Sequence, residues 1–461
     1  MTKIHIIGVG GSGMSAIARV LQESGNTVSG SDRVASPAAE KLRADGVRVL
    51  IGHQAGHIKG AELVLRSSAI PDDNPEVVAA KAAGIPVLKR AEYLGKLMAG
   101  KRCIAVAGSH GKTTTTAMIA WILVEAGKDP SYIIGGVSKN LGSNAHAGKG
   151  SVFVIEADEY DRMFLGLTPH LIVITNIEYD HPDVFPTPEI YRQAFIDFAG
   201  KLDEKGELLA CHDDPGSDGL VGKLGVDSQF EARVASYGID PWATYQASQV
   251  KPNRLGGSDF VAFYQPRGGD KVRLAEVSLS IPGEHNVRNA LGALAAAHRL
   301  GLSMEKAGFA LQSFTGTARR FEVAGEAKGV TLIDDYAHHP TEIRATLAAA
   351  RARYPGRRIW AVWQPHTYSR TQALRDEFLA SFAGADRVIV TDIYAAREPA
   401  AELSSASLAA AMAHPAVDFV PSLGEVVSSL LSRLAPGDVV LVLSAGDADQ
   451  VTAQVLAALQ K

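Results

Sequence analysis

The stretch IAVAGSHGKTTTT at residues 104–116 constrains the fold of this chain more than any other segment. An apolar run is followed by glycines, a lysine and a run of threonines, which is the order of a strand, a phosphate-binding loop and a helix. The first glycine of the usual loop pattern is missing, because Val106 stands in its place. Gly108 and Gly111 still allow the backbone to fold around phosphate oxygens, so the stretch predicts a nucleotide site at the edge of a parallel sheet.

The same order of strand, turn and helix recurs along the chain. KIHIIGV at 3–9 and RRIWAVW at 357–363 each precede a polar or glycine-rich turn and an Ala/Leu-rich stretch. Strands that alternate with helices predict an α/β protein whose parallel sheets are covered on both faces. Short alternating runs between about 228 and 282 predict a small antiparallel sheet within the middle of the chain.

The chain has 461 residues, enough for about three domains of roughly 150 residues each. The strand–helix pattern restarts near residues 98–101 and again near residues 313–317. The predicted domains are therefore 1–98, 99–314 and 315–461.

Composition excludes several classes of protein. The formal net charge is −4, and no dense Lys/Arg run is interleaved with aromatic residues, so we expect neither nucleic acid nor an acidic membrane as a partner. No apolar run approaches the ~18 residues that a membrane span needs. Cys103 and Cys211 lie in apolar, strand-like runs and are expected to be buried thiols, as in a cytoplasmic protein.

A second glycine motif, GVGGSG at residues 8–13, follows the first strand-like run. Together with Asp32 at the end of the next run, it matches the pattern of a pyrophosphate-binding turn. NAD, FAD or a UDP-sugar would each suit this loop. The predicted domain is short for a complete dinucleotide fold, which favours a nucleoside diphosphate.

Two further apolar runs place acidic and polar side chains at their ends. SVFVIEADEYD at 151–161 supplies Glu156, Asp158 and Glu159, and LIVITNIEYDHPDVF at 171–185 supplies Asn176, Asp180 and His181. The carboxyl ends of parallel strands line the crevice in which ligands bind. Lys112 can reach ATP phosphates there, while Thr113 and the carboxylates suit Mg²⁺.

These motifs together resemble those of the Mur ligases, amide-forming ATP-dependent enzymes of peptidoglycan synthesis. The loop GSHGKTT is similar to the family's G-[ST]-H-G-K-T-[ST], which explains the missing glycine, and the likeness extends over the whole chain. The other similar motifs are GVGGSGMSAIA at 8–18, SGSD at 29–32, SSAI at 67–70, EADE at 156–159, GEHNVRNALGALAA at 283–296, TGTARRFE at 315–322, DDYAHHPTE at 334–342, WQPHTYSRT at 363–371 and SAGD at 444–447.

The resemblance implies three domains: a Rossmann-like N-terminal domain, a central ATPase-like domain and a Rossmann-like C-terminal domain. It also implies roles for particular residues. The ATP-binding set is Gly108, Ser109, His110, Gly111, Lys112, Thr113, Thr114, His285, Asn286, Asn289, Arg320 and Asp335. The set for the UDP-linked substrate is Gly10, Gly11, Ser12, Asp32, His53, Ser67 and Ser68. Tyr336, His338, His366 and Arg370 would face the muramate carboxylate and the amino acid, and Thr113, Glu156 and His181 would hold Mg²⁺.

Within the family, the motifs are most similar to members that add L-alanine to UDP-N-acetylmuramate. Several other members use a carbamylated lysine, and the matching place here falls on or near Phe195, with no lysine between His181 and Lys201. EADEYD and DDYAHHPTE are also similar to the member that attaches recycled murein tripeptide. Thr367 stands where many alanine-adding members have arginine.

The implied reaction converts a carboxylate to an acyl phosphate with the γ-phosphoryl group of ATP, and an amine then displaces phosphate. Lys112, His338 and Arg370 are the expected catalytic residues, with His338 or His339 as a candidate base. Arg320 and Arg370 lie in a different predicted domain from the phosphate loop, so the reaction requires domain closure. An NAD-dependent oxidoreductase and an ATPase switch are the alternatives from other classes. The expected state is a monomer or a weak homodimer.

Overall fold

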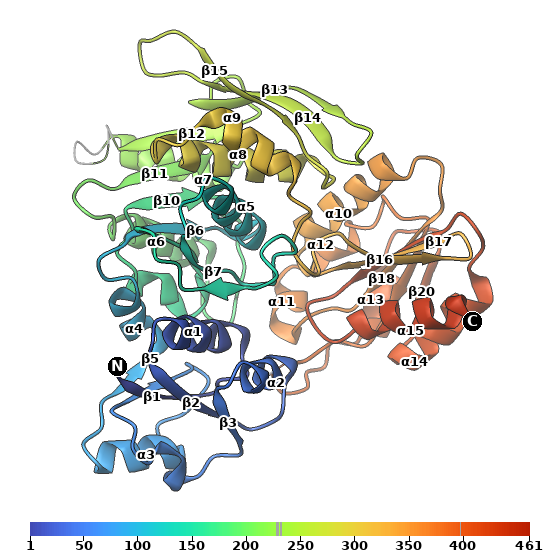
Figure 1. The fold of residues 1–461 in the computed structure, drawn as a ribbon. Helices are drawn as coiled ribbons and strands as arrows, with labels where there is room; N and C mark the ends of the chain where they lie inside the picture. The colour runs from blue at the N-terminus through green and yellow to red at the C-terminus, as the bar shows by residue number, and fades with distance from the viewer. Residues whose placement is uncertain (227–229, 231–232, 397) are drawn as a thin grey trace.

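The computed structural model describes residues 1–226, 230, 233–396 and 398–461, and these fold around three sheets that follow one another along the chain (Figure 1). The first sheet has five parallel strands in the order β3-β2-β1-β4-β5. Its strands are β1 (Lys3–Ile7), β2 (Thr27–Asp32), β3 (Arg48–Ile51), β4 (Leu63–Arg66) and β5 (Val87–Lys89). Its helices are α1 (Ser12–Glu23), α2 (Pro37–Ala44), α3 (Pro75–Ala82) and α4 (Arg90–Leu97), with a 3₁₀ helix η1 (Ala55–Ile58).

The central sheet has ten strands in the order β15-β14-β13-β12-β11-β10-β6-β9-β7-β8. Its strands are β6 (Arg102–Ala107), β7 (Ser131–Ile133), β8 (Ala145–His146), β9 (Val152–Glu156), β10 (Leu171–Ile174), β11 (Glu207–Cys211), β12 (Val234–Gly238), β13 (Tyr245–Pro252), β14 (Ser258–Tyr264) and β15 (Val272–Ser278). Its helices are α5 (Lys112–Glu125), α6 (Pro188–Ala199), α7 (Pro215–Gly225), α8 (Glu284–Arg299) and α9 (Met304–Gln312), with a 3₁₀ helix η2 (Tyr160–Gly166).

The predicted antiparallel strands are present as β13, β14 and β15, and they continue the central sheet. Strand β12 pairs with β13 in parallel through Tyr237 and Gly238, which joins the two parts into one surface. The positions 228–229 and 231–232 of the predicted range lie outside the described residues. The long helix α8 is rich in alanine and packs closely on α5, and most residues of both helices are buried against one face of the sheet (Figure 1).

The third sheet has six strands in the order β16-β17-β21-β18-β19-β20, with β16 antiparallel at one edge. Its strands are β16 (Glu322–Ala327), β17 (Val330–Asp335), β18 (Ile359–Trp363), β19 (Arg387–Val390), β20 (Val417–Phe419) and β21 (Val439–Leu443). Its helices are α10 (Pro340–Arg353), α11 (Tyr368–Ala373), α12 (Arg375–Leu379), α13 (Ser405–Ala411), α14 (Leu423–Arg433) and α15 (Asp449–Gln460).

The order of the central strands places the predicted ligands together. Strand β6 lies between β9 and β10, so the phosphate loop after β6 is flanked by the acidic ends of its two neighbours. Val106 is completely buried in β6, which confirms that the residue at the place of the missing glycine belongs to the core. Both cysteines are buried and free, as predicted. Among the described residues, no helix is long and apolar enough to cross a membrane.

Candidate active site

The phosphate loop, residues 108–114, packs tightly on its surroundings. Gly108 and Gly111 both have positive φ, at 134° and 79°, a region that side chains rarely adopt. A Cβ atom on Gly108 would lie 2.1 Å from Thr175 Oγ1, and one on Gly111 would lie 2.6 Å from Asn289 Oδ1. Glycine is therefore required at both positions to bring the loop against β10 on one side and α8 on the other.

A cavity of about 300 Å³ opens beside this loop, between the central and C-terminal domains. Its walls come from the loop, from α8, from the ends of β10 and β11, and from the third sheet. Nine of the twelve predicted ATP-binding residues line it, namely His110, Gly111, Thr113, Thr114, His285, Asn286, Asn289, Arg320 and Asp335. The cavity therefore brings together residues that are up to about 225 positions apart in the sequence.

The predicted metal ligands divide into two groups around Lys112. Thr113 Oγ1 donates a hydrogen bond of 2.9 Å to Glu156 Oε1, so these two oxygen ligands are adjacent. His181 instead lies beside Glu159, with 3.6 Å between Nε2 and Oε1. Lys112 Nζ is 2.8 Å from Glu159 Oε2, and Glu159 is fully buried. Glu159, which lay outside the predicted metal set, thus links the lysine to the histidine.

Phe195 lies on or near the place at which the resemblance predicts the modified lysine of other Mur ligases to fall. It lies in α6, is fully buried and packs edge-on against Phe164 with a ring separation of 5.5 Å. A charged side chain there would lose its hydration without a partner. The core around α6 is therefore built for an aromatic residue at this position.

Arg370 connects the C-terminal domain to the central one. Its Nε donates to Asp180 Oδ1 at 2.7 Å, and its Nη2 donates to Oδ2 at 3.3 Å. The two side chains are only 5% and 2% exposed. Burial by itself would raise the pKa of Asp180, but Arg370 holds that pKa well below its usual range. The carboxylate and the guanidinium therefore form a buried, bidentate ion pair.

The remaining predicted residues for muramate and the amino acid adjoin this contact. Arg370 Nη1 lies 3.0 Å from His366 Nδ1, and the rings of His366, His338 and Tyr336 follow one another at separations of 5.9 and 5.3 Å. Burial lowers the pKa of His338 to about 3 and that of His366 to about 4. Both rings are therefore neutral near pH 7 and can orient a ligand by hydrogen bonding, but they are weak proton acceptors.

Sequence reasoning missed two carboxylates that surround His110. Its Nε2 lies 3.2 Å from Glu178 Oε2, and its Nδ1 lies 3.2 Å from Glu342 Oε1. Glu178 also accepts a 2.6 Å hydrogen bond from Thr341 Oγ1 at the start of α10. Glu178 follows the strand β10 at the same edge as Asn176 and Asp180, so its place after the strand was the available signal.

The segment 175–181 carries contacts to both domains. Asn176 Oδ1 accepts the amide N–H of His110 at 2.8 Å, and the backbone of Glu178 exchanges hydrogen bonds of 2.6 and 2.9 Å with Ser109 Oγ. Farther along, the side chains of Glu178 and Asp180 meet Thr341 and Arg370 of the C-terminal domain. One short segment therefore holds the phosphate loop and the C-terminal domain at once.

His110 gives the stability a pH dependence that can be measured. Burial would lower its pKa, but Glu342 and Glu178 raise the pKa from 6.5 to about 9. A raised folded-state pKa stabilises the protein fully below about pH 6.5, and this contribution is lost as the pH rises through about 9. At about 1.4 kcal/mol per pKa unit the loss is on the order of 3 kcal/mol.

We therefore expect the apparent Tm of the wild type to fall more steeply between about pH 7 and about pH 10 than that of His110→Gln, which cannot lose this proton. Calorimetry or circular dichroism measures both curves. Other groups that titrate in this range are common to the two proteins, so equal declines would contradict the assignment.

Asp32, at the end of β2, fixes the first glycine loop. Its Oδ2 accepts the amide N–H of Gly10 at 2.8 Å. Gly11 and Ser12 are exposed at the start of α1, and Ser12 lines a smaller cavity of about 80 Å³. That cavity also contains Arg90, Glu156 and Asp158, so it runs from the first domain toward the predicted metal ligands.

The other predicted residues for the UDP-linked substrate lie along the same sheet edge or beyond it. Ser67 follows β4 and donates its amide to Ile7 O at 3.1 Å, and Ser68 is exposed next to it. His53 instead contacts a buried carboxylate, with 3.2 Å between its Nδ1 and Glu76 Oε1. The same carboxyl group accepts from Ser31 and contacts His5 and His57, so His53 belongs to an internal polar cluster.

Comparisons with known proteins agree with this arrangement. Three family models match in order: Mur ligase family, catalytic domain, at residues 3–102; Mur ligase middle domain at 106–297; and Mur ligase, glutamate ligase domain, at 319–446. A UDP-N-acetylmuramate–L-alanine ligase of Chloroflexus aggregans is 44% identical over 470 residues, covering 100% of this chain and 99% of the relative.

Solved structures show the same architecture. The UDP-N-acetylmuramate–alanine ligase of Thermotoga maritima has a TM-score of 0.81 at 29% identity, covering 100% of this chain and 99% of that one. A murein peptide ligase of Psychrobacter arcticus has a TM-score of 0.72 at 26% identity, with the same coverage. The three-domain α/β fold predicted from the sequence is thereby confirmed.

Proposed function

Because this chain belongs to the Mur ligase family, we infer that it joins L-alanine to the carboxylate of UDP-N-acetylmuramate at the expense of ATP. The observation that carries this inference is the cavity between the two domains, in which the phosphate loop faces Arg320 and Asp335. If the protein were an ATPase switch, Arg370 and the neighbouring rings of His366 and His338 would have no role. An oxidoreductase would leave the phosphate loop without one.

We propose that the residues act mainly by positioning and by neutralising charge. Lys112 and Arg320 would face the transferred phosphoryl group of ATP. Arg370 and the neutral rings of His338 and His366 would orient the carboxylate of the amino acid and the oxyanion of the tetrahedral intermediate. The ring of His338 is too weakly basic to be a good general base, since its pKa is about 3.

The oxygen ligands fit Mg²⁺, which prefers carboxylate and hydroxyl oxygens. Thr113 and Glu156 would hold one ion and His181, beside Glu159, would border a second. When bound, Mg²⁺ would neutralise charge on the ATP phosphates.

The domain boundaries at residues 98 and 314, the monomeric or weakly dimeric state and the cytoplasmic location stay predictions.

The test is phosphate release from ATP with UDP-N-acetylmuramate present and L-alanine, glycine, L-serine or murein tripeptide supplied side by side. We expect release to require both UDP-N-acetylmuramate and the amino acid, with L-alanine giving the highest kcat/KM. Preference for the tripeptide would contradict the choice within the family. Release that is independent of UDP-N-acetylmuramate would contradict the ligase function altogether.

A further inference from the structure

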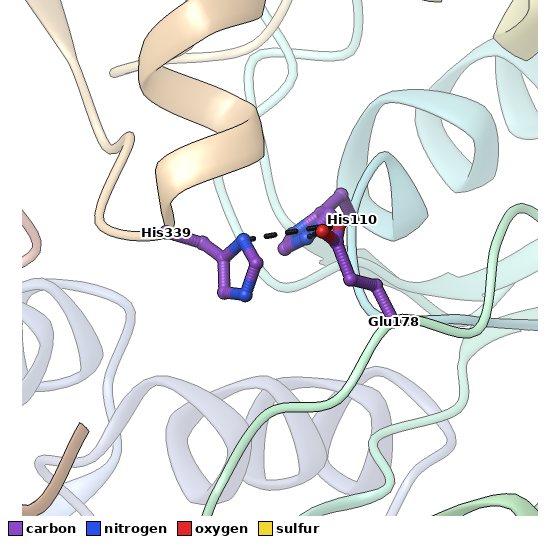
Figure 2. A group of neighbouring side chains, drawn as sticks. All are labelled: His110, Glu178 and His339. Atoms are coloured by element: carbon purple, nitrogen blue, oxygen red, sulfur yellow. Dashed lines mark hydrogen bonds and ion pairs between the residues drawn. The ribbon is translucent and has the colours of Figure 1, made fainter. Parts of the chain in front are cut away.

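The side chains of His110, Glu178 and His339 converge from three segments of the chain (Figure 2). His110 comes from the phosphate loop, Glu178 from the segment after β10, and His339 from the residue that caps α10. One nitrogen or oxygen atom of each residue lies within 4.8 Å of the corresponding atoms of the other two. None of the three belongs to the magnesium set proposed above.

The spacing of these atoms suits a small transition-metal ion. His110 Nε2 lies 3.2 Å from Glu178 Oε2, and His339 Nδ1 lies 3.8 Å from the same oxygen. Around a tetrahedral Zn²⁺ ion with bonds of about 2.0–2.2 Å, neighbouring ligand atoms are about 3.3–3.6 Å apart. The two distances lie on either side of that value, so only small side-chain movements separate the present arrangement from a bound one.

The second ring nitrogen of each histidine already has an acceptor. His110 Nδ1 lies 3.2 Å from Glu342 Oε1, and His339 Nε2–H donates to the carbonyl oxygen of Tyr179 at 3.4 Å. Metal-binding histidines show this pattern, because the outer hydrogen bond fixes the ring and leaves the other nitrogen for the ion. His339 Nδ1 now accepts the amide of Thr341 over 3.3 Å, a long bond that an ion would replace.

We propose that His110, Glu178 and His339 form a binding site for Zn²⁺ that fastens the C-terminal domain to the phosphate loop. Two imidazoles and one carboxylate, with a fourth position left for water, are a ligand set that Zn²⁺ takes and Mg²⁺ disfavours. On binding, the Nε2–H bond of protonated His110 breaks, its electron pair forms the bond to Zn²⁺, and the proton leaves to solvent. Because the ligands come from two domains, the bound ion favours the closed arrangement.

The experiment is a titration of the full chain with Co²⁺, in saturating Mg²⁺ and without nucleotide, followed by visible absorption. We expect one Co²⁺ per chain with the bands of a four-coordinate ion, release of a proton, and displacement by Zn²⁺. His339→Ala and Glu178→Gln should each abolish the bands. His338→Ala removes the adjacent histidine and should keep them.

Bands that are absent from the wild type, or that survive in both ligand variants, would overturn the proposal. Wild-type crystals soaked in Zn²⁺ give a readout that does not depend on the folding of any variant. An anomalous peak at the zinc edge between the three side chains supports the site, and peaks found only elsewhere overturn it. Neither readout involves the ligase reaction, so the outcome is separate from that of the proposed function.

Discussion

Replacing Lys112 with methionine is expected to lower kcat by about 10²–10³-fold, the usual effect of removing one preorganised charge from the transition state. The ammonium group lies 2.8 Å from Glu159 Oε2 and 3.1 Å from the carbonyl oxygen of Ser109, at the start of α5. From this position it can exchange these contacts for the oxygens of the transferred phosphoryl group. Rapid-quench measurement of ADP formation under single-turnover conditions isolates this step.

The Lys112→Met change also leaves the fully buried Glu159 with one partner fewer, so loss of activity could follow from loss of structure. The double variant Lys112→Met/Glu159→Gln removes that buried charge. We expect it to regain the wild-type Tm but not kcat. Lys128→Met, an exposed change just after the same helix, is the matched control. Recovery of kcat in the double variant would show that the lysine acts on structure alone.

Replacing Arg370 with methionine is expected to lower kcat/KM by about 10²–10⁴-fold. Removing one partner of a buried ion pair costs about 3–5 kcal/mol, because the other charge is left without compensation. Here the stranded group would be Asp180, which regains water if the two domains separate. The lost free energy therefore destabilises the closed arrangement of the two domains. Steady-state kinetics with L-alanine and ATP varied separately measures this effect.

Arg370 has two proposed roles: it pairs with the buried Asp180, and it orients the carboxylate of the amino acid. A double-mutant cycle distinguishes them. In Arg370→Met/Asp180→Leu the buried charge is gone, so closure should recover, and small-angle scattering with nucleotide and UDP-N-acetylmuramate would show the compaction. The KM for L-alanine should stay raised, because the guanidinium is still missing. Arg375→Met, in the same region but paired with the exposed Asp376, is the control. A loss below about tenfold in Arg370→Met would contradict a buried charge of this kind.

The parts of the molecule that could be predicted are those coded by short segments. The strand, loop and helix at 104–116 are specified by local patterns, and the order of neighbouring parallel strands then brings Glu156 and His181 to the same sheet edge. His110, Gly111, Thr113 and Thr114 line the cavity for the same reason, whereas Arg320 and Asp335 reach it from the C-terminal domain and were predicted only through the family resemblance. Local patterns of this kind are read along the chain and do not depend on how the domains dock.

The contacts between domains could not be predicted in the same way. Glu342 is 232 positions from His110, and Asp180 is 190 positions from Arg370, so no spacing rule connects them. His53 is a second case: its predicted contact with the substrate stays a prediction, and its contact with the buried Glu76 was not indicated by any pattern in the sequence. A buried carboxylate in a helix gives no signal in the sequence for the histidines that will surround it.

The segment 175–181 connects the nucleotide site to the predicted amino-acid site. It is bonded to the phosphate loop at one end and to the C-terminal domain at the other. The phosphate loop and the C-terminal residues Thr341 and Arg370 are thus connected through one segment of a few residues. We therefore expect nucleotide binding to change the position of Thr341 and Arg370, and with them the shape of the predicted amino-acid site.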